Sequence, residues 1–479
     1  MQQAYNPFLP SWEYIPDGEP YVFGDRVYVY GSHDRFGAPL FCLNDYVCWS
    51  APVDDLGHWS CSGVIYRRNQ DPLNRLGLRL LFAPDVARGP DGRYYLYYAF
   101  DFLGVMGVAV CDTPDGLYQF HGHVHYPDGT VWGRRRGDEF PFDPGVLVDD
   151  DGRVYLYSGF ETHVPAMLSR FRGHKNSGGV VLELEQDMVT IKAGPRLLFP
   201  RKGNHPPDDF RGHEFFEASS IRKIDGRYVF VYSSTNNHDL CWAVSDRPDG
   251  DFRFGGVLVD QGDLYMAGRT DERQALNYLG NTHGGMVQLH GDWYIFYHRQ
   301  TNRHSYSRQA CAERLSRTPD GGFLQAEVTS CGLNGGPLRQ DGEYPARIAC
   351  CLWSRHGTAR YDRPFKKAEH PFFTQDKPDD DRTSVQYIAN MRDGAVAGFR
   401  YFDIRSVQHI RLVIGGTCRG TVQVSSSPDF ADIAAAIPVQ AHRGILQAHG
   451  SLSLPQGVHA LFFRFSGEGA MDFYAFEMS

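Results

Sequence analysis

The chain has 479 residues and a net charge of −9, with 42% hydrophobic, 22% charged and 14% aromatic residues. This charge excludes a general nucleic-acid surface, which needs a basic stripe. No segment approaches the ~20 apolar residues that a membrane-spanning helix requires. The length exceeds one compact core and predicts two or three domains, and the high aromatic content favours an all-β fold.

A turn containing Gly, followed by an alternating strand rich in Tyr or Trp, occurs five times in the first 300 residues. The five phrases begin at Gly24, Gly92, Gly152, Gly226 and Gly291. Alternation of this kind is typical of strands in a sheet, and the long period indicates a unit of several strands. Five such units predict a five-bladed β-propeller.

One ionisable side chain lies a few residues before each phrase, and these residues are 58 to 74 positions apart: Asp17, Asp85, Asp143, Glu217 and His283. If each precedes the innermost strand of a blade, all five converge on the propeller axis. For any single Asp, a turn-capping role is the alternative. Glu and His are not typical turn residues, so the recurrence in register favours a functional site.

The remaining third of the chain lacks the repeated phrase. Residues 334–347 are rich in Gly and Pro and are expected to form a linker. The short apolar strands beyond them are typical of a β-sandwich. The predicted organisation is therefore a propeller over residues 1–333, a linker over 334–347 and a β-sandwich over 348–479.

Ten cysteines are scattered without paired CxxC spacing, which disfavours a zinc site and a disulfide framework. The first residues show neither a basic nor an apolar region of a secretory signal. We therefore expect a cytoplasmic protein with reduced thiols, with a trimmed signal as the alternative.

Three carboxyl groups in one channel have a specific chemical use. Like charges at close range cannot all ionise, so at least one of Asp17, Asp143 and Glu217 should keep its proton near neutrality. Phe215 and Phe216 give Glu217 an apolar setting, which predicts that Glu217 is a general acid. Asp17 is then the general base and Asp143 orients and tunes the acid. This combination is what hydrolysis of a glycosidic bond requires.

Two further carboxylates, Glu19 and Glu214, compete for these roles because they lie close by in the sequence. His283 has two interpretations: it approaches a hard cation through water, or it is a structural histidine inside the channel. No organic cofactor is expected.

The chain resembles glycoside hydrolase family 43 through a series of motifs that occur in order over residues 6–315. These motifs contain Asp17, His33, Asp85, Phe142, Asp143, Phe216, Glu217, His283 and Arg299. The resemblance implies a five-bladed propeller and an inverting mechanism, with Asp17 as base, Asp143 as pKa modulator and Glu217 as acid. It also implies an axial Ca²⁺ near His283 and sugar contacts from His33, Asp85, Phe142, Phe216 and Arg299.

The chain departs from the family pattern at two places: Gly18 follows the base instead of Pro, and Ala218 and Ser219 follow the acid. Fructosidases of related fold use Arg-Asp-Pro and Glu-Cys phrases, and this chain has neither.

The C-terminal part resembles a family 6 carbohydrate-binding module. Only Trp353 of the seven tryptophans lies beyond residue 330, so we expect that part to be structural.

We therefore predict an inverting exo-glycosidase that removes terminal pentoses from short oligosaccharides, with β-D-xylose as first choice and α-L-arabinofuranose as second. The alternatives are a glycosidase for galactofuranose, a non-catalytic sugar-binding propeller and a structural interaction module. Neither nucleic acid nor membrane is an expected partner, and the sequence does not define the oligomeric state.

Overall fold

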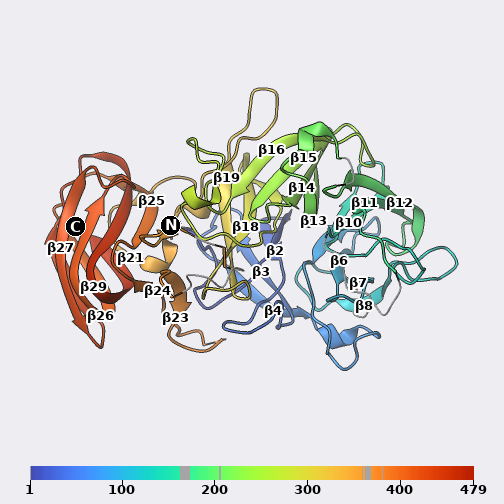
Figure 1. Ribbon diagram of the computed structural model, residues 1–479. Coiled ribbons are helices and arrows are strands. Elements are labelled where there is room, and N and C mark those ends of the chain that lie inside the picture. The colour runs from blue at the N-terminus through green and yellow to red at the C-terminus, as the bar shows by residue number, and fades with distance from the viewer. Residues whose placement is uncertain (1, 162–172, 204–205, 359, 362–367, 380) are drawn as a thin grey trace.

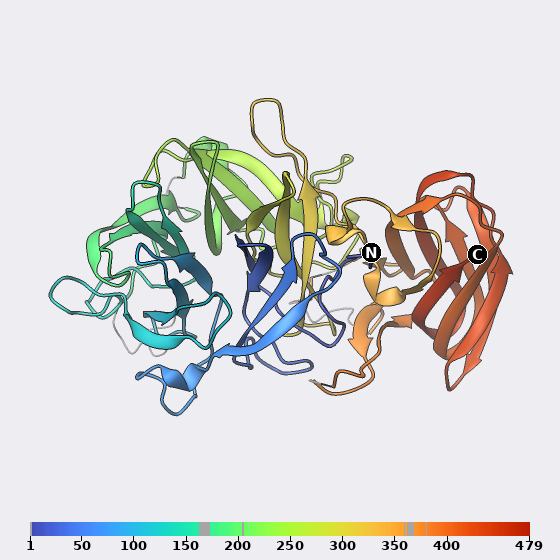
Figure 2. The same ribbon diagram turned by 180° about the vertical axis from the view of Figure 1, so that it is seen from behind.

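The computed structural model describes residues 2–161, 173–203, 206–358, 360–361, 368–379 and 381–479. It is all-β, with a propeller followed by a second domain that lies at one side of it (Figure 1, Figure 2). Helical structure in these residues is limited to short 3-10 turns: η1 (Arg68–Gln70), η2 (Asp208–Phe210), η3 (Glu272–Gln274), η4 (Gly332–Asn334) and η5 (Ala346–Ile348). None of the described helices is long and apolar enough to span a membrane.

Five antiparallel sheets form the five predicted blades. Blade I contains β1 (Glu19–Phe23), β2 (Arg26–Tyr30), β3 (Tyr46–Pro52) and β4 (Ser60–Tyr66). Blade II contains β5 (Asp85–Arg88), β6 (Tyr94–Ala99), β7 (Met106–Cys111) and β8 (Gln119–His123). Blade III contains β9 (Gly145–Val148), β10 (Val154–Gly159), β11 (Gly178–Leu184) and β12 (Ile191–Pro200). Blade IV contains β13 (Phe215–Ile224), β14 (Arg227–Ser234), β15 (Asp239–Ser245) and β16 (Arg253–Asp260). Blade V contains β17 (Met286–Leu289), β18 (Asp292–Gln300) and β19 (Arg308–Leu315).

The repeated phrase is the hairpin between the first and second strands of each blade. Its glycines all adopt the left-handed backbone, with φ of 66° at Gly24, 84° at Gly92, 80° at Gly152, 78° at Gly226 and 85° at Gly291. Glycine occupies this region without steric cost, which explains why it recurs at this position. The aromatic strand that follows is the second strand, and most of its side chains are buried.

The hydrophobic cores lie between neighbouring blades. One cluster joins Tyr30 of blade I to Tyr98 of blade II, and another joins Tyr157 of blade III to Phe230 of blade IV. Because each blade buries its faces against two neighbours, the ring fixes where every innermost strand begins.

The N-terminal segment completes blade V, whose sheet has three strands. The Asn6 side chain donates to the Ala312 carbonyl at 2.9 Å and accepts from the Ala312 N–H at 3.0 Å. The Asn6 backbone N–H also donates to the Ser330 carbonyl at 3.0 Å. The side-chain amide thus supplies the hydrogen bonds that a neighbouring strand would make to the N–H and C=O of Ala312 at the edge of β19. It joins the start of the chain to the last blade.

The second domain is a curled ten-stranded sheet. It contains β20 (Leu338–Arg339), β21 (Glu343–Pro345), β22 (Cys351–Trp353), β23 (Phe372–Gln375), β24 (Gln386–Met391), β25 (Val396–Ile404), β26 (His409–Ser425), β27 (Ile433–His442), β28 (Leu446–Ser451) and β29 (Gly457–Met478). The 17-residue β26 and the 22-residue β29 pair along most of their lengths and connect the other strands. The sheet encloses an aromatic core that includes Phe399, Phe463 and Phe476.

The segment 334–347, expected to be a linker, belongs to this sheet. Its β20 pairs with β25 and its β21 pairs with β29. Strands that occur much later in the sequence therefore order a stretch whose composition alone is typical of a loop.

We expect Asn6→Ala to destabilise the protein, because it leaves the buried N–H and C=O of Ala312 without partners. Unsatisfied groups of this kind predict a loss of about 2–4 kcal/mol in the free energy of unfolding. Thermal unfolding followed by circular dichroism should show a lower midpoint. The exposed neighbour Gln2 provides the control, since Gln2→Ala should leave the midpoint unchanged. Equal midpoints for both variants would contradict this account of ring closure.

Candidate active site

A cavity of about 580 Å³ opens where the innermost strands begin. Four carboxyl residues line it, and three of them were predicted: Asp17 two residues before β1, Asp143 two residues before β9, and Glu217 within β13. The fourth, Asp101, accepts the Leu80 N–H at 2.6 Å. His283, three residues before β17, lines it as well. The ring therefore brings together four of the five ionisable residues that recur in the sequence.

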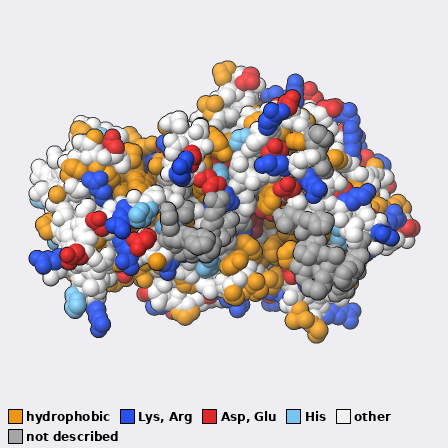
Figure 3. Space-filling model, in the orientation of Figure 1, with side chains coloured by type: hydrophobic (Ala, Val, Ile, Leu, Met, Phe, Trp, Pro, Cys, Tyr) orange, Lys and Arg blue, Asp and Glu red, His pale blue; other side chains and the backbone are white. Residues whose placement is uncertain are grey.

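Aromatic rings cover much of the cavity wall. The Phe and Tyr rings that line it are those of Phe41, Phe82, Phe102, Phe142, Phe160, Phe216, Tyr306 and Tyr361. Phe142 lies with its ring centroid 5.5 Å from Phe82 and 4.7 Å from Phe160, and Phe160 is 5.8 Å from Phe216. Hydrophobic side chains gather in the middle of the face seen in Figure 3. The predicted residues Phe142 and Phe216 thus belong to one aromatic wall around the carboxyl groups.

The backbone at the carboxyl residues departs from regular strand geometry. Asp17 has φ of 58°, Asp143 has φ of 44°, and Ala218, directly after Glu217, has φ of 70°. Such values are uncommon for residues other than glycine and concentrate at functional sites. The register of β13 against β14 also shifts on both sides of Glu217. Bulges of this kind redirect a side chain out of the regular ladder.

Asp17 lies beside a buried cation. Arg308 Nη1 is 2.9 Å from Asp17 Oδ1, and His298 Nδ1 is 3.3 Å from the same oxygen. Burial raises the pKa of Asp17, but the positive charge of Arg308, helped by neighbouring polar groups, more than offsets this and holds that pKa below its ordinary value. Burial, reinforced by Arg308, lowers the pKa of His298 to about 3, so its ring is neutral near pH 7. The guanidinium is therefore the charge that keeps Asp17 ionised.

Arg308 is itself held by a second aspartate. Its Nε is 2.8 Å from Asp34 Oδ2 and its Nη2 is 3.0 Å from Asp34 Oδ1. Arg308 is 3% exposed and Asp34 is fully buried. This bidentate pairing fixes the plane of the guanidinium and leaves Nη1 directed at Asp17.

Glu217 has the opposite electrostatic character. Burial and the negative charge of Asp17 raise the pKa of Glu217 to about 8, so its carboxyl group is protonated near neutral pH. Burial, together with the neighbouring carboxyl groups of Glu217 and Asp17, also raises the pKa of Asp143. Asp143 Oδ2 accepts the Ala218 N–H at 3.1 Å. This bond ties the backbone beside Glu217 to blade III.

His283 faces Asp143, with Nδ1 3.5 Å from Asp143 Oδ2. Burial lowers the pKa of His283 to about 4, so the ring is neutral near pH 7. Its Nε2 is buried and has no hydrogen-bond partner among the described residues. Such a nitrogen can accept a hydrogen bond from water or approach a cation. In the described part of the chain, a group of three potential metal ligands occurs at His213, Asp239 and Cys241 and not around His283.

An ionised and a protonated carboxyl group thus face one cavity. Asp17 is able to accept a proton and Glu217 is able to donate one near neutral pH. Residues of both kinds are needed for general acid and base catalysis of bond hydrolysis.

The competing carboxylates lie outside the lining of this cavity. Glu19 is fully buried and accepts hydrogen bonds from Arg222 at 2.8 Å and Ser220 at 3.0 Å. Glu214 accepts a hydrogen bond from the Thr235 hydroxyl at 3.3 Å. Both side chains are engaged within the scaffold.

His33 and Asp85, which were expected to contact substrate, do not line the cavity. His33 Nε2 is 3.1 Å from Glu13 Oε1. Asp85 is fully buried and accepts hydrogen bonds from the Val146 N–H and the Tyr21 hydroxyl, each at 2.6 Å. Asp85 therefore links blade II to blades I and III inside the scaffold.

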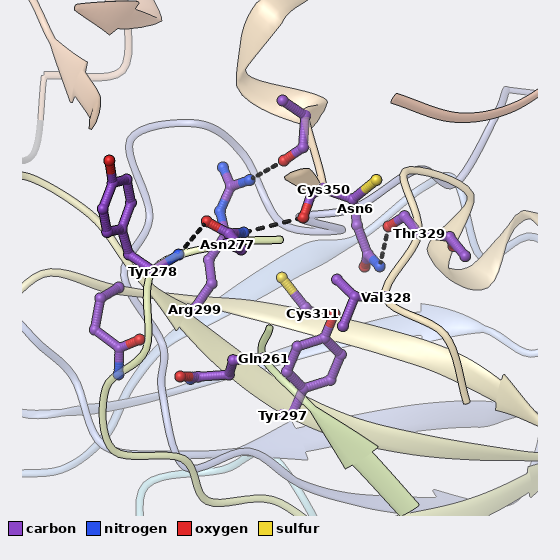
Figure 4. Close-up of a pocket in the computed structure, with 12 residues that line it drawn as sticks. Asn6, Gln261, Asn277, Tyr278, Tyr297, Arg299, Cys311, Val328, Thr329 and Cys350 are labelled. Atoms are coloured by element: carbon purple, nitrogen blue, oxygen red, sulfur yellow. Dashed lines mark hydrogen bonds between the residues drawn. The ribbon is translucent and has the colours of Figure 1, made fainter. Parts of the chain in front are cut away.

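Arg299, which was expected near the sugar, faces the second domain instead. Its Nη1 donates to the Ala349 carbonyl at 3.0 Å (Figure 4). Its Nη2 donates to the Arg347 carbonyl at 2.7 Å. Its guanidinium also lies 3.8 Å from the centroid of the Phe373 ring. The arginine of blade V that reaches the carboxyl groups is Arg308.

The sequence interpretation missed Arg308, His298, Tyr306 and Tyr361. The available signal for Arg308 is a charge at the start of the apolar run Arg308-Gln-Ala-Cys-Ala, which is typical of a buried ion pair. Its partner Asp17 lies 291 residues away, so no local pattern reveals the pair.

The fold and the two carboxyl groups define the class of protein: a propeller with the acid and base groups of a glycoside hydrolase. The family model described as glycosyl hydrolases family 43 matches residues 6–323. The chain belongs to this family and is a glycoside hydrolase.

Two curated proteins and one solved structure illustrate the similarity. A xylosidase/arabinosidase of Thermoclostridium stercorarium is 46% identical over 480 residues, which is 100% of this chain and 99% of the relative. A β-xylosidase of Xylanibacter ruminicola is 28% identical over 335 residues, covering 60% of this chain and 88% of the relative. An arabinoxylan arabinofuranohydrolase structure from Bacillus subtilis matches with a TM-score of 0.52 at 19% identity, covering 100% of this chain and 99% of the other. The structural likeness shows a shared fold.

We expect the pH profile of kcat/KM to report the two carboxyl groups. Activity should fall as pH rises through about 8, because Glu217 then loses the proton it must donate. Activity should persist to low pH, because the pKa of Asp17 lies below its ordinary value. Glu217→Gln should lower kcat/KM about 10²–10⁴-fold and abolish the alkaline limb. Initial rates from pH 4 to pH 10 measure both effects.

Glu214→Gln makes the same chemical change three residues away, outside the cavity, and should keep the alkaline limb of the wild type. An unchanged limb in Glu217→Gln would show that another group donates the proton.

Proposed function

We propose that the protein is an inverting exo-glycosidase that removes terminal pentoses from short oligosaccharides, β-D-xylose first and α-L-arabinofuranose second. The observation that carries the proposal is the ionised Asp17 and the protonated Glu217 in one cavity. The names of the xylosidase and arabinosidase relatives support a pentose substrate. A cytoplasmic location is part of the proposal, supported by ten cysteines that are all free.

In the proposed reaction, Asp17 accepts a proton from a water molecule as the water oxygen attacks the anomeric carbon. The bond between that carbon and the leaving oxygen breaks, and Glu217 donates its proton to the leaving oxygen. Attack from the face opposite the leaving group inverts the anomeric configuration. The cycle leaves Asp17 protonated and Glu217 ionised, and proton exchange with solvent restores the starting state.

Asp143 acts in this scheme as a positioning residue. Its carboxyl oxygen accepts the Ala218 N–H and so fixes the backbone directly after Glu217. Phe142 and Phe216 offer apolar ring surface against which a pentose ring can pack. His33, Asp85 and Arg299 receive no sugar contact in this proposal, because each is engaged elsewhere in the scaffold.

For the second domain, we propose a diverged β-sandwich of the family 6 carbohydrate-binding type with a structural role. Its strands enclose a single apolar core, and its sheet also packs against the propeller. Trp353 is half-buried, with its ring centroid 6.1 Å from that of Phe462. Most of its surface is therefore unavailable as a flat platform for a sugar.

We also propose that a divalent cation such as Ca²⁺ lies on the axis near His283 and is held partly by water. Support comes from buried polar atoms without partners in the described part of the chain: His283 Nε2, Thr282 Oγ1 and Glu19 Oε1. Calcium prefers oxygen ligands and accepts several waters. When bound, it would add positive charge near His283.

Among nitrophenyl pentosides, we expect the highest kcat/KM on the β-D-xylopyranoside, a lower value on the α-L-arabinofuranoside and the lowest on a galactofuranoside. Proton NMR during the first minutes of hydrolysis should show the α-anomer of xylose first, because inversion of a β-linkage produces it.

The β-anomer as first product would contradict the inverting mechanism. A wild-type protein that binds these sugars without turnover would instead be a sugar-binding propeller.

We expect EDTA to lower the thermal unfolding midpoint and added CaCl₂ to restore it, because an ion bound only to the folded state stabilises that state. His283→Ala should abolish the difference. The exposed His290 provides a control, since His290→Ala should keep the calcium response. A wild-type midpoint that does not respond to either addition would contradict the cation proposal.

A further inference from the structure

The second domain reaches the active-site cavity. Tyr361 belongs to the hydrophobic core cluster of that domain and also lines the cavity beside propeller residues. Its ring stacks on Tyr278 with centroids 5.1 Å apart, and its backbone N–H donates to the Leu279 carbonyl at 3.1 Å. Tyr361 is 3% exposed, so its position is fixed by packing.

The second domain also holds the segment 276–281, which leads to His283. The Leu352 N–H donates to the Leu276 carbonyl at 2.8 Å. Asn277 Nδ2 donates to the Cys350 carbonyl at 3.0 Å (Figure 4). The last two residues of this segment line the cavity. Its position at the cavity therefore depends on contacts made outside the propeller.

A third contact involves the loop 301–307 between β18 and β19, which gives three residues to the cavity lining. The Asn302 N–H donates to the Phe373 carbonyl at 2.8 Å, and Asn302 Oδ1 accepts from the Thr374 hydroxyl at 3.2 Å. Both partners belong to β23 of the second domain. Arg308, which keeps Asp17 ionised, directly follows this loop.

We propose that the second domain is part of the catalytic unit and that Tyr361 determines which leaving groups the pocket accepts. The carboxyl groups of Asp17, Asp143 and Glu217 belong to the propeller, whereas Tyr361, which lines the same cavity, belongs to the core of the second domain. In an exo-acting enzyme, the terminal sugar lies at the carboxyl groups, and the rest of the oligosaccharide extends along other residues that line the cavity. Tyr361 then supplies ring surface to the second sugar. This inference rests on the proposed function.

The test compares Tyr361→Ala with the wild type on xylotriose and on nitrophenyl β-D-xyloside. We expect the ratio of kcat/KM for xylotriose to that for the nitrophenyl xyloside to fall at least fivefold. Tyr361→Phe keeps the ring and should stay within twofold of the wild-type ratio. Tyr387→Ala is the control, because Tyr387 is a tyrosine of the same domain outside the cavity, stacked on Tyr474. Tyr361→Leu replaces the alanine variant if the latter does not fold.

An unchanged ratio would overturn the proposal, because a merely structural role lowers both rates by the same factor. Sugar binding is measured in parallel through the shift in unfolding midpoint with xylose and with xylotriose. If the wild type turns over neither substrate, the proposed function fails, and the binding shifts still test Tyr361. A xylotriose shift reduced in Tyr361→Ala, with the xylose shift retained, supports its contact with the second sugar. Equal shifts in variant and wild type exclude that contact.

Discussion

The buried guanidinium of Arg308 sets the charge state on which the site depends. Removing carboxyl groups from water favours their neutral forms, so three of them around one cavity would all tend to keep their protons. Among these three groups, Arg308 lowers the pKa of Asp17 alone. Its Nη1 contacts Asp17, whereas its Nε and Nη2 are occupied by Asp34. The resulting negative charge on Asp17 then raises the pKa of Glu217. One cation thus separates the proton affinities of two similar groups.

The propeller could be predicted from the sequence because its signals are local. Each blade carries a glycine that must adopt a left-handed turn, followed by an aromatic strand. The second domain lacks such a repeated turn signal. Its curled sheet depends on β26 and β29, which are far longer than ordinary strands. The segment 334–347 contains strands because distant partners supply the hydrogen bonds.

The carboxyl groups could be predicted to lie together because they recur at matching positions in the repeat. The cation that pairs with Asp17, Arg308, could not be predicted in this way. Arg299 pairs with Gln309 across the last hairpin, and Arg308 pairs with Gln300. The two arginines therefore occupy adjacent positions of the pleat, whose side chains point to opposite faces. One contacts the second domain and the other contacts Asp17. A shift of one residue in the strand register would exchange the faces on which the two arginines lie. The composition of the sequence does not reveal this register.

The contact between Asn6 and Ala312 joins residues 306 positions apart. During synthesis the N-terminal segment emerges first, yet its partner strand is made only after four blades exist. That segment must remain without its final neighbours while most of the propeller is being assembled. Closure of the ring is therefore a late event with a large cost in chain entropy, and the early blades need enough stability from their own interfaces to persist until then.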